Sequence, residues 1–188
     1  MSNDMKEPIL IYNIKQANRF GKWHFLDKYK YDPYILLDKS REYSRSLNTC
    51  TTGIYVSNDW NGILGYAYIG TADGEGICNQ KANFVVTNTV FGEKVFHKAH
   101  KLTTLHEIGH NLGAEHDLTH DCNKTRFIEC SPSDQYIMSY RSNTGNTKNN
   151  NLFSPFSVDM IKKMLKLTKR RNCLKRRNIF YFKLFSMF

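Results

Sequence analysis

The sequence lacks the features that would place part of it in a membrane. No apolar run approaches the roughly 20 residues of a membrane-spanning helix, and the most apolar stretch, residues 179–188, is about half that length and contains Lys183. The first residues are polar and include Asp4 and Glu7, whereas a signal peptide combines a basic, an apolar and a small-residue region. The sequence as written therefore predicts neither a membrane span nor an export signal.

Acidic residues are absent from residues 162–177, which hold nine of the basic residues behind the net charge of +10. Such a cluster can act as a nuclear address or bind nucleic acid or an acidic membrane. Helical spacing in this stretch favours instead the solvated face of a terminal helix. No nucleic-acid-binding motif accompanies the cluster, so nucleic acid is not an expected partner.

The length of 188 residues and an apolar content of 40% indicate one globular domain with enough mass for a core. Against this ordinary background one stretch stands out. The sequence His106-Glu-Ile-Gly-His110-Asn-Leu-Gly113-Ala-Glu-His116 fits H-E-x-x-H-x-x-G-x-x-H at every specified position.

This motif has the geometry of a zinc site. Residues four apart lie on one helix face, so His106 and His110 can aim two ring nitrogens at one ion. Gly113 can adopt a positive φ, end the helix and return the chain so that His116 becomes a third ligand. Zinc accepts such a set and keeps an open position for water, from which Glu107 can take a proton. The motif predicts zinc-dependent peptide hydrolysis.

The alternative is a coincidental match. H-E-x-x-H by itself occurs in helices that bind nothing, whereas Gly113 and His116 at fixed offsets make coincidence improbable. A second element follows at Tyr136-Ile-Met-Ser-Tyr140, where Met138 is expected to form an apolar floor beneath the metal. On its own Met138 would be an ordinary core methionine.

The long motif followed by Asp117 and a Met-turn resembles the metzincins, and within them the adamalysin or ADAM (reprolysin) zinc metalloproteases. Residues 62–70, 76–78 and 136–157 are most similar to the sheddases that cleave Notch, amyloid precursor and pro-TNF. The resemblance is nearly continuous over residues 32–172. It implies a zinc metalloendopeptidase that acts outside the cell or at its surface, with membrane association only through parts absent from this chain.

The implied fold is the α/β metzincin fold, with a mixed, mainly parallel sheet, helices, and an irregular lower subdomain ending in a helix. Local patterns predict a helix from Asp32-Pro33 to about residue 48, strands at 52–56, 63–69 and 82–90, a catalytic helix over about 97–112, and a last helix capped by Ser157. The expected organisation is an N-terminal segment (1–31) with at most a short strand, a catalytic domain (32–173) and a basic and apolar tail (174–188).

The resemblance also implies how substrate binds. The strand at 63–69 would be a sheet edge along which an extended peptide pairs through its backbone, although an ordinary edge strand is the simpler reading without the zinc helix. Leu64 and Gly65 would border the pocket for the residue after the scissile bond, and Leu102 and Thr103 would form another wall. At the remaining wall this chain departs from its relatives with Arg141-Ser142-Asn143, which puts the pocket's apolar preference in question.

Tyr140 follows Met138 by two residues, a spacing that astacins and serralysins share. Its phenol would then stabilise the oxyanion or act as an extra ligand. The competing interpretation is a surface tyrosine in a loop.

Five cysteines make an odd set. The resemblance implies a Cys78–Cys173 disulfide and a Cys122–Cys130 substitute for a second bridge, and it leaves Cys50 as a free thiol. The alternative is five reduced thiols in a cytosolic protein.

Only 105 residues precede His106, whereas the family places a strand, a long helix and a strand before the helix at Asp32. The sequence therefore predicts that the N-terminal part of the catalytic domain is missing. The alternative to an active protease is accordingly an inactive truncated remnant that binds zinc or a peptide without turnover.

Overall fold

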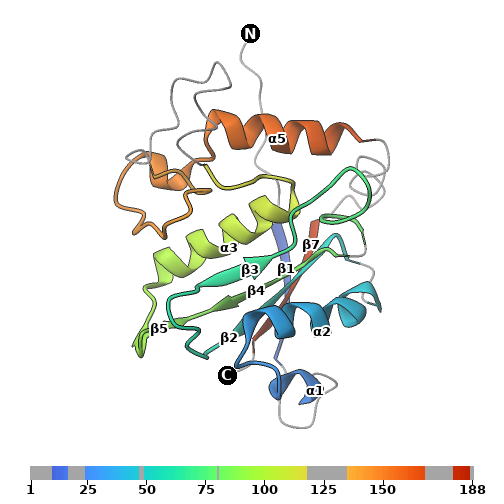
Figure 1. Ribbon diagram of the computed structural model, residues 1–188, viewed down its shortest axis with the longest axis vertical. Helices are drawn as coiled ribbons and strands as arrows, with labels where there is room; N and C mark the ends of the chain where they lie inside the picture. Colours follow the sequence, from blue (N-terminus) through green and yellow to red (C-terminus); the bar gives the residue numbers. More distant parts are fainter. Residues whose placement is uncertain are drawn as a thin grey trace.

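The computed structural model describes residues 10–16, 24–46, 49–79, 81–117, 135–167 and 180–186. Its centre is a five-stranded sheet in the order β1-β7-β2-β4-β3 (Figure 1). The strands are β1 (Leu10–Gln16), β2 (Thr51–Val56), β3 (Gly65–Ala67), β4 (Asn83–Thr87) and β7 (Phe180–Ser186). The pairs β1/β7, β7/β2 and β2/β4 are parallel, and β3 runs antiparallel to β4. The predicted mixed, mainly parallel sheet is confirmed.

The remaining elements surround this sheet. They are α1 (His24–Asp27), α2 (Pro33–Ser46), α3 (His97–Asn111), the 3₁₀ turn η1 (Asn149–Asn151), α5 (Pro155–Lys166) and a two-stranded hairpin of β5 (Thr89–Val90) and β6 (Glu93–Lys94). No helix within these described ranges is both long and apolar enough to cross a bilayer.

The central strands β2 and β4 are buried along their whole length, because α2 covers one face of the sheet and α3 the other. Alternate side chains point to opposite faces. Ile54 and Val56 therefore join Leu36 and Leu37 in one core cluster, while Tyr55 packs with Phe84 on the face against α3. The helix α3 is thus supported by β4 and the edge strand β3.

The C-terminal end of α3 is fixed to the sheet by a buried polar network. Asn111 accepts a hydrogen bond from the Thr51 hydroxyl at 2.5 Å and donates to the carbonyl of Tyr68 at 2.9 Å. Its amide also donates to the carbonyl of Asn83, whose own amide donates to Ser40 on α2 at 2.7 Å. Buried side-chain amides that are paired in this way lock the relative positions of the elements they join.

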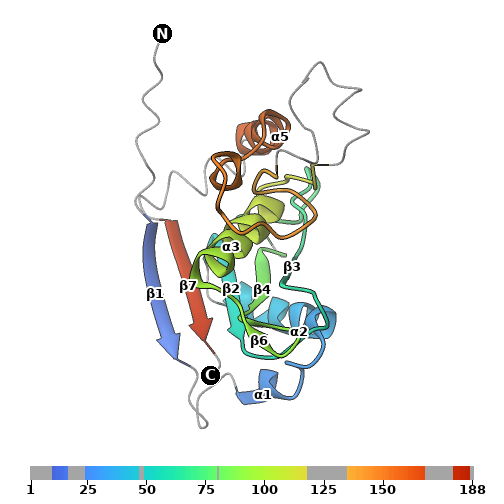
Figure 2. The same ribbon diagram turned by 90° about the vertical axis from the view of Figure 1, so that its left-hand side faces the viewer.

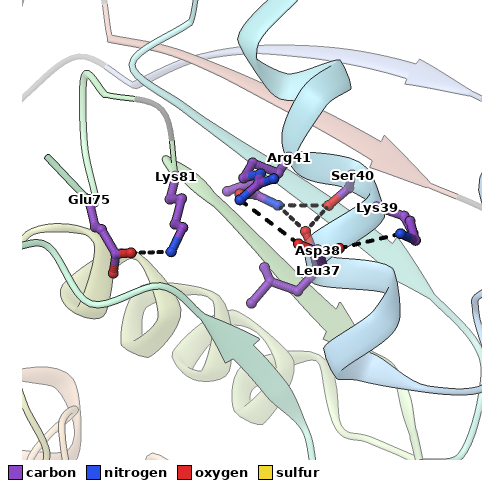
Figure 3. A network of polar contacts seen from close by, with 8 residues as sticks. Leu37, Asp38, Lys39, Ser40, Arg41, Glu75 and Lys81 are labelled. Atoms are coloured by element: carbon purple, nitrogen blue, oxygen red, sulfur yellow. Dashed lines mark hydrogen bonds and ion pairs between the residues drawn. The ribbon is translucent and has the colours of Figure 1, made fainter.

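Surface charges on α2 add little to this arrangement. Figure 3 shows Asp38 facing Lys39 and Arg41, at 3.5 and 4.0 Å, and Glu75 facing Lys81 across a loop. The Asp38 pairs are about half exposed, and exposed ion pairs contribute roughly 0–1 kcal/mol.

The helix starts confirm one sequence prediction and correct another. Asp32 caps α2, because its Oδ1 accepts hydrogen bonds from the backbone N–H groups of Tyr34 and Ile35 at 2.8 and 3.0 Å. The predicted cap of the last helix, Ser157, is wrong. Ser154 is the N-cap of α5 and Pro155 begins the helix, which suits proline's fixed φ and missing N–H.

The strand predictions were too long. The edge strand expected at 63–69 is reduced to β3, and the strand expected at 82–90 is split into β4 and β5. At this break the backbone N–H of Thr89 donates to the Thr87 hydroxyl at 3.2 Å, and that hydroxyl donates to the carbonyl of Asn58 at 2.5 Å.

The ends of the described chain differ most from expectation. Residues 180–186, assigned from sequence to a tail, form β7 between β1 and β2, and Figure 2 shows β1 and β7 side by side. Thr51 pairs with Phe182 and Tyr55 with Ser186, so β2 is not an exposed edge. Parallel pairing with a strand more than 120 residues away is a long-range contact that local sequence patterns cannot reveal.

Candidate metal centre and active site

The predicted catalytic helix ends as the motif requires. In the structure α3 closes at Asn111, and Gly113 has φ +89°. The backbone N–H of Ala114 bonds the carbonyl of Gly109 at 2.9 Å, and that of Gly113 bonds His110 at 2.8 Å. This is a Schellman end, which needs a residue with positive φ at the position of Gly113. The chain then reverses and brings His116 back to the helix.

Three histidines meet at this point. Nε2 of His116 lies 3.0 Å from Nε2 of His106 and 3.2 Å from Nε2 of His110. Nitrogens at tetrahedral angles around one zinc ion would be ~3.3 Å apart. The three rings therefore converge at the spacing of a tridentate metal site, and they are the one such His/Cys/Asp/Glu group in the described part of the chain.

The other ring nitrogens set the tautomers. Nδ1 of His106 lies 2.7 Å from the carbonyl oxygen of Ile137, and Nδ1 of His110 lies 2.8 Å from that of Ala114. A carbonyl can only accept, so each Nδ1 carries the proton and donates. Each Nε2 is left with its lone pair directed at the cluster, which is the arrangement of a metal ligand supported from behind.

The protein keeps these rings neutral. Burial lowers the pKa of His106 to about 3, with the neighbouring His110 acting in the same direction. Burial likewise lowers the pKa of His110 to about 4 and lowers that of His116. At neutral pH the cluster offers three uncharged nitrogens, the form that binds metal.

Glu107 occupies a tight, dry position beside the cluster. Its side chain is 4% exposed, and burial raises its pKa well above the ordinary value of 4.5. Gly65 on β3 leaves no free space next to it, since a Cβ added there would lie 2.8 Å from Cδ of Glu107. The carboxyl group is thus held between α3 and the edge strand.

Met138 is fully buried and packs against the middle of α3. A Cβ added to Gly109, the residue before His110, would overlap the Met138 sulfur and lie 2.9 Å from Phe153. The turn around Met138 also receives the chain after the third histidine, because the N–H of Asp117 bonds the Met138 carbonyl at 2.9 Å. Met138 therefore packs against the histidine helix, and its predicted role beneath a metal ion stays a prediction.

Asp117 connects His116 to α5, a link that the sequence analysis missed. Its Oδ1 accepts hydrogen bonds from Ser154 at 2.5 Å and Ser157 at 2.9 Å. Ser154 also accepts from the N–H of Ser157 as the helix cap, so one hydroxyl serves both contacts. Burial raises the pKa of Asp117, and the two serines act in the opposite direction. The sequence signal was present in Ser154-Pro155, which marks a helix start.

A cleft runs along β3 past the histidines. Its lining includes all four residues predicted to bind substrate, Leu64, Gly65, Leu102 and Thr103, together with Glu107 and the three histidines. Residues 139–143 also line it. Tyr140 is 65% exposed, and its ring centre lies 6.4 Å from that of His116. The roles of these residues stay predictions.

Two of the five cysteines, Cys50 and Cys78, lie within the described residues. Cys78 is disulfide-bonded, and its N–H donates to the carbonyl of Cys50 at 2.7 Å. Cys173, Cys122 and Cys130 lie outside the described residues. Cys50 is buried, and its predicted thiol state stays a prediction.

Known proteins that are similar to this chain are metallopeptidases. Residues 40–167 match the model of the reprolysin-like M12B metallo-peptidases. The chain is 29% identical over 160 residues to human disintegrin and metalloproteinase domain-containing protein 10, which covers 75% of this chain and 21% of that protein.

Two nematode relatives from Caenorhabditis elegans also match. A homologue of disintegrin and metalloproteinase domain-containing protein 17 is 33% identical over 124 residues (54% of this chain, 18% of that protein), and a homologue of protein 10 is 36% identical over 81 residues (43% and 8%). The chain spans about a fifth of the length of the human protein named above. A family model that matches most of the chain and includes the histidine cluster shows that this protein belongs to the reprolysin-like M12B metallo-peptidase family.

Proposed function

We propose that this chain binds zinc through His106, His110 and His116 and hydrolyses peptide bonds within protein substrates. The observation that carries the proposal is the convergence of three neutral histidines, whose possible ligand atoms all lie within 4.8 Å of one another, beside a buried glutamate. Nitrogen ligands with an open position are the donor set of catalytic zinc. Bound there, zinc would polarise a peptide carbonyl and make a water molecule acidic near neutral pH.

Glu107 is the proposed general base. Its carboxylate takes a proton from the attacking water and returns it to the leaving nitrogen. Burial favours the protonated form of this side chain. A carboxylate that binds its proton more strongly than an exposed glutamate is a better base for this step.

The backbone of β3 is the proposed peptide-binding edge. The carbonyl of Leu64 accepts a hydrogen bond from Thr87 on β4 at 2.9 Å. Backbone groups alternate in direction along an antiparallel strand, so those of Gly65 and Ala67 face away from β4. An extended substrate can pair with these groups as an added strand, with Leu64, Gly65, Leu102 and Thr103 bordering the pocket after the scissile bond.

We further propose that the enzyme works on protein ectodomains outside the cell. The similarity to the disintegrin and metalloproteinase proteins supports this, and so does the disulfide at Cys78, since disulfides persist in oxidising compartments. The catalytic domain would span residues 32–173, with β1 and β7 adding two strands to its sheet.

The test uses the purified chain, zinc and a quenched generic peptide. We expect hydrolysis that a chelator abolishes and zinc restores. Glu107→Gln should keep one zinc and lose about 10²–10⁴-fold in rate, because only the base is removed. His110→Ala should lose the zinc itself, whereas His97→Ala, an exposed histidine on the same helix, should keep it. Zinc binding without turnover by the unaltered chain would support the remnant that only binds.

A further inference from the structure

The charge distribution within the cleft is uneven. Among the residues that line the cleft in the described part of the chain, Arg141 is the one fixed charge outside the catalytic group of three histidines and Glu107. The other lining residues are apolar, glycine, hydroxyl or amide side chains. A single cation in such a setting gives a bound peptide one strong electrostatic contact.

Arg141 has no acidic partner among the described residues, because none of their ion pairs includes it. It is exposed, and its guanidinium carbon lies 5.9 Å from the ring centre of Tyr140. An aromatic ring at this distance holds a guanidinium weakly and leaves its N–H donors unused. Those donors match the geometry of a carboxylate.

The backbone that carries Arg141 is firmly placed. Asn143 is buried, and its amide donates to the carbonyls of Gln135 and Tyr136, both at 3.4 Å. Its side-chain oxygen accepts from the N–H of Gly145 at 3.2 Å. Because the Asn143 amide is occupied within the protein, recognition at this wall is left to Arg141 and Ser142.

A second cation lies close to this wall. A Cβ added to Gly145 would lie 2.5 Å from Cε of Lys98 and 3.0 Å from Cδ1 of Leu102. The Lys98 stem therefore packs beside Leu102, which lines the cleft, while Lys98 as a whole is exposed. Lys98 thus lies near Leu102 without being one of the lining residues of the cleft.

We propose that the cleft wall formed by Arg141 and Ser142 selects substrates with an aspartate or glutamate side chain on the carboxyl side of the scissile bond. Arg141 is the residue that determines this preference. The proposal rests on the peptidase function above. The resemblance would suggest an apolar pocket, whereas the pocket proposed here favours a carboxylate.

The test changes the charge of the peptide substrate and, separately, the charge at position 141 of the protein. Quenched peptides of one parent sequence carry Glu, Gln or Lys in turn at each of the three positions after the scissile bond. At one position we expect kcat/KM for Glu to exceed that for Gln by about five- to tenfold, and the margin to shrink at high salt. Arg141→Met should remove the preference, and Arg141→Glu should turn it towards Lys. Lys162→Glu, an exposed residue of α5 outside the cleft, changes the net charge equally and should leave the preference intact.

A binding measurement separates this proposal from the proposed function. The zinc-loaded Glu107→Gln variant, with or without Arg141→Glu, is titrated with the same peptides and their Kd values are compared. Tighter binding of Glu peptides that reverses in the double variant supports the selection even if the unaltered chain hydrolyses nothing. Equal Kd and equal kcat/KM for Glu, Gln and Lys at all three positions would overturn it.

Discussion

Gly65 on the edge strand lies directly against the carboxyl group of Glu107, so close that a single added methyl would be 2.8 Å from its Cδ. The residue predicted only to border a substrate pocket thus also confines the proposed general base. Gly65→Ala should push the carboxylate out of place and lower kcat by up to about 100-fold, since small misplacements of catalytic groups have effects of that size.

The zinc content of Gly65→Ala should be unchanged, because the three atoms nearest to the new methyl group all belong to Glu107 and none to a histidine. Steady-state kinetics combined with metal analysis checks this prediction. A variant with normal kcat would show that Glu107 does not depend on the space that Gly65 leaves.

Ser154 is predicted to matter as a partner of Asp117 and not only as a helix cap. Ser154→Ala should lower the free energy of unfolding by about 1–3 kcal/mol, since it removes a cap and a hydrogen bond to a charged group. Ser157→Ala, which keeps the cap, should cost less. Ser154→Asp distinguishes the two roles.

Aspartate caps helices as well as serine does, yet here it would set a second carboxylate against that of Asp117. Ser154→Asp should therefore be destabilised and should bind zinc less tightly through the adjacent His116. Urea unfolding and zinc titration measure both effects. If Ser154→Asp is as stable as the unaltered protein, the Asp117 contact has no energetic role.

The buried Glu107 should make the metal-free protein's stability depend on pH. Its pKa is raised on folding, so at pH above the folded pKa the charged, buried carboxylate destabilises the fold, and this penalty is relieved as the pH falls towards 4.5. Metal-free Glu107→Gln should therefore be more stable than the parent at pH 8, and the difference should shrink as the pH falls.

The histidines act in the opposite direction in both proteins. Their lowered pKa values mean that stability is lost as the pH falls from 6.5 towards about 3, because the unfolded chain takes up protons first. Their effect cancels when the two proteins are compared. Thermal unfolding with chelator from pH 8 to 5 gives the difference, and a constant difference would contradict the role assigned to Glu107.

β7 should be part of the cooperative fold. Leu184 pairs with Ile14 on one side and Gly53 on the other. Leu184→Pro should destabilise the protein by about 3 kcal/mol or more, because proline in a central strand removes a ladder hydrogen bond. Leu184→Val, which keeps the donor and favours strand, is the control. Equal urea midpoints for the proline variant and the parent would place β7 outside the folding unit.

Tyr140 is exposed, and its ring centre lies 6.4 Å from that of His116, so its predicted role as an oxyanion donor can be tested. We expect Tyr140→Phe to lower kcat by about tenfold or more with little change in KM, as loss of an oxyanion donor does. An unchanged kcat would leave Tyr140 as a surface residue of the loop.

The sequence by itself determined the helix that carries His106 and His110. His106 and His110 share a helix face because of the α-helical period, and Gly113 ends that helix because it readily takes a positive φ. Both are local properties, so the spacing of these residues is enough to predict where the helix ends and which histidines converge. The Asp32 cap and the buried strands β2 and β4 were predictable for the same reason.

Only the tertiary structure decided what surrounds that helix. The Ile137 carbonyl that fixes the tautomer of His106, the serines that hold Asp117, and the contact between Gly65 and Glu107 all join residues at least 31 positions apart. The place of β7 between β1 and β2 joins residues further apart still. Such contacts depend on how whole elements pack, and no local pattern of residues specifies them.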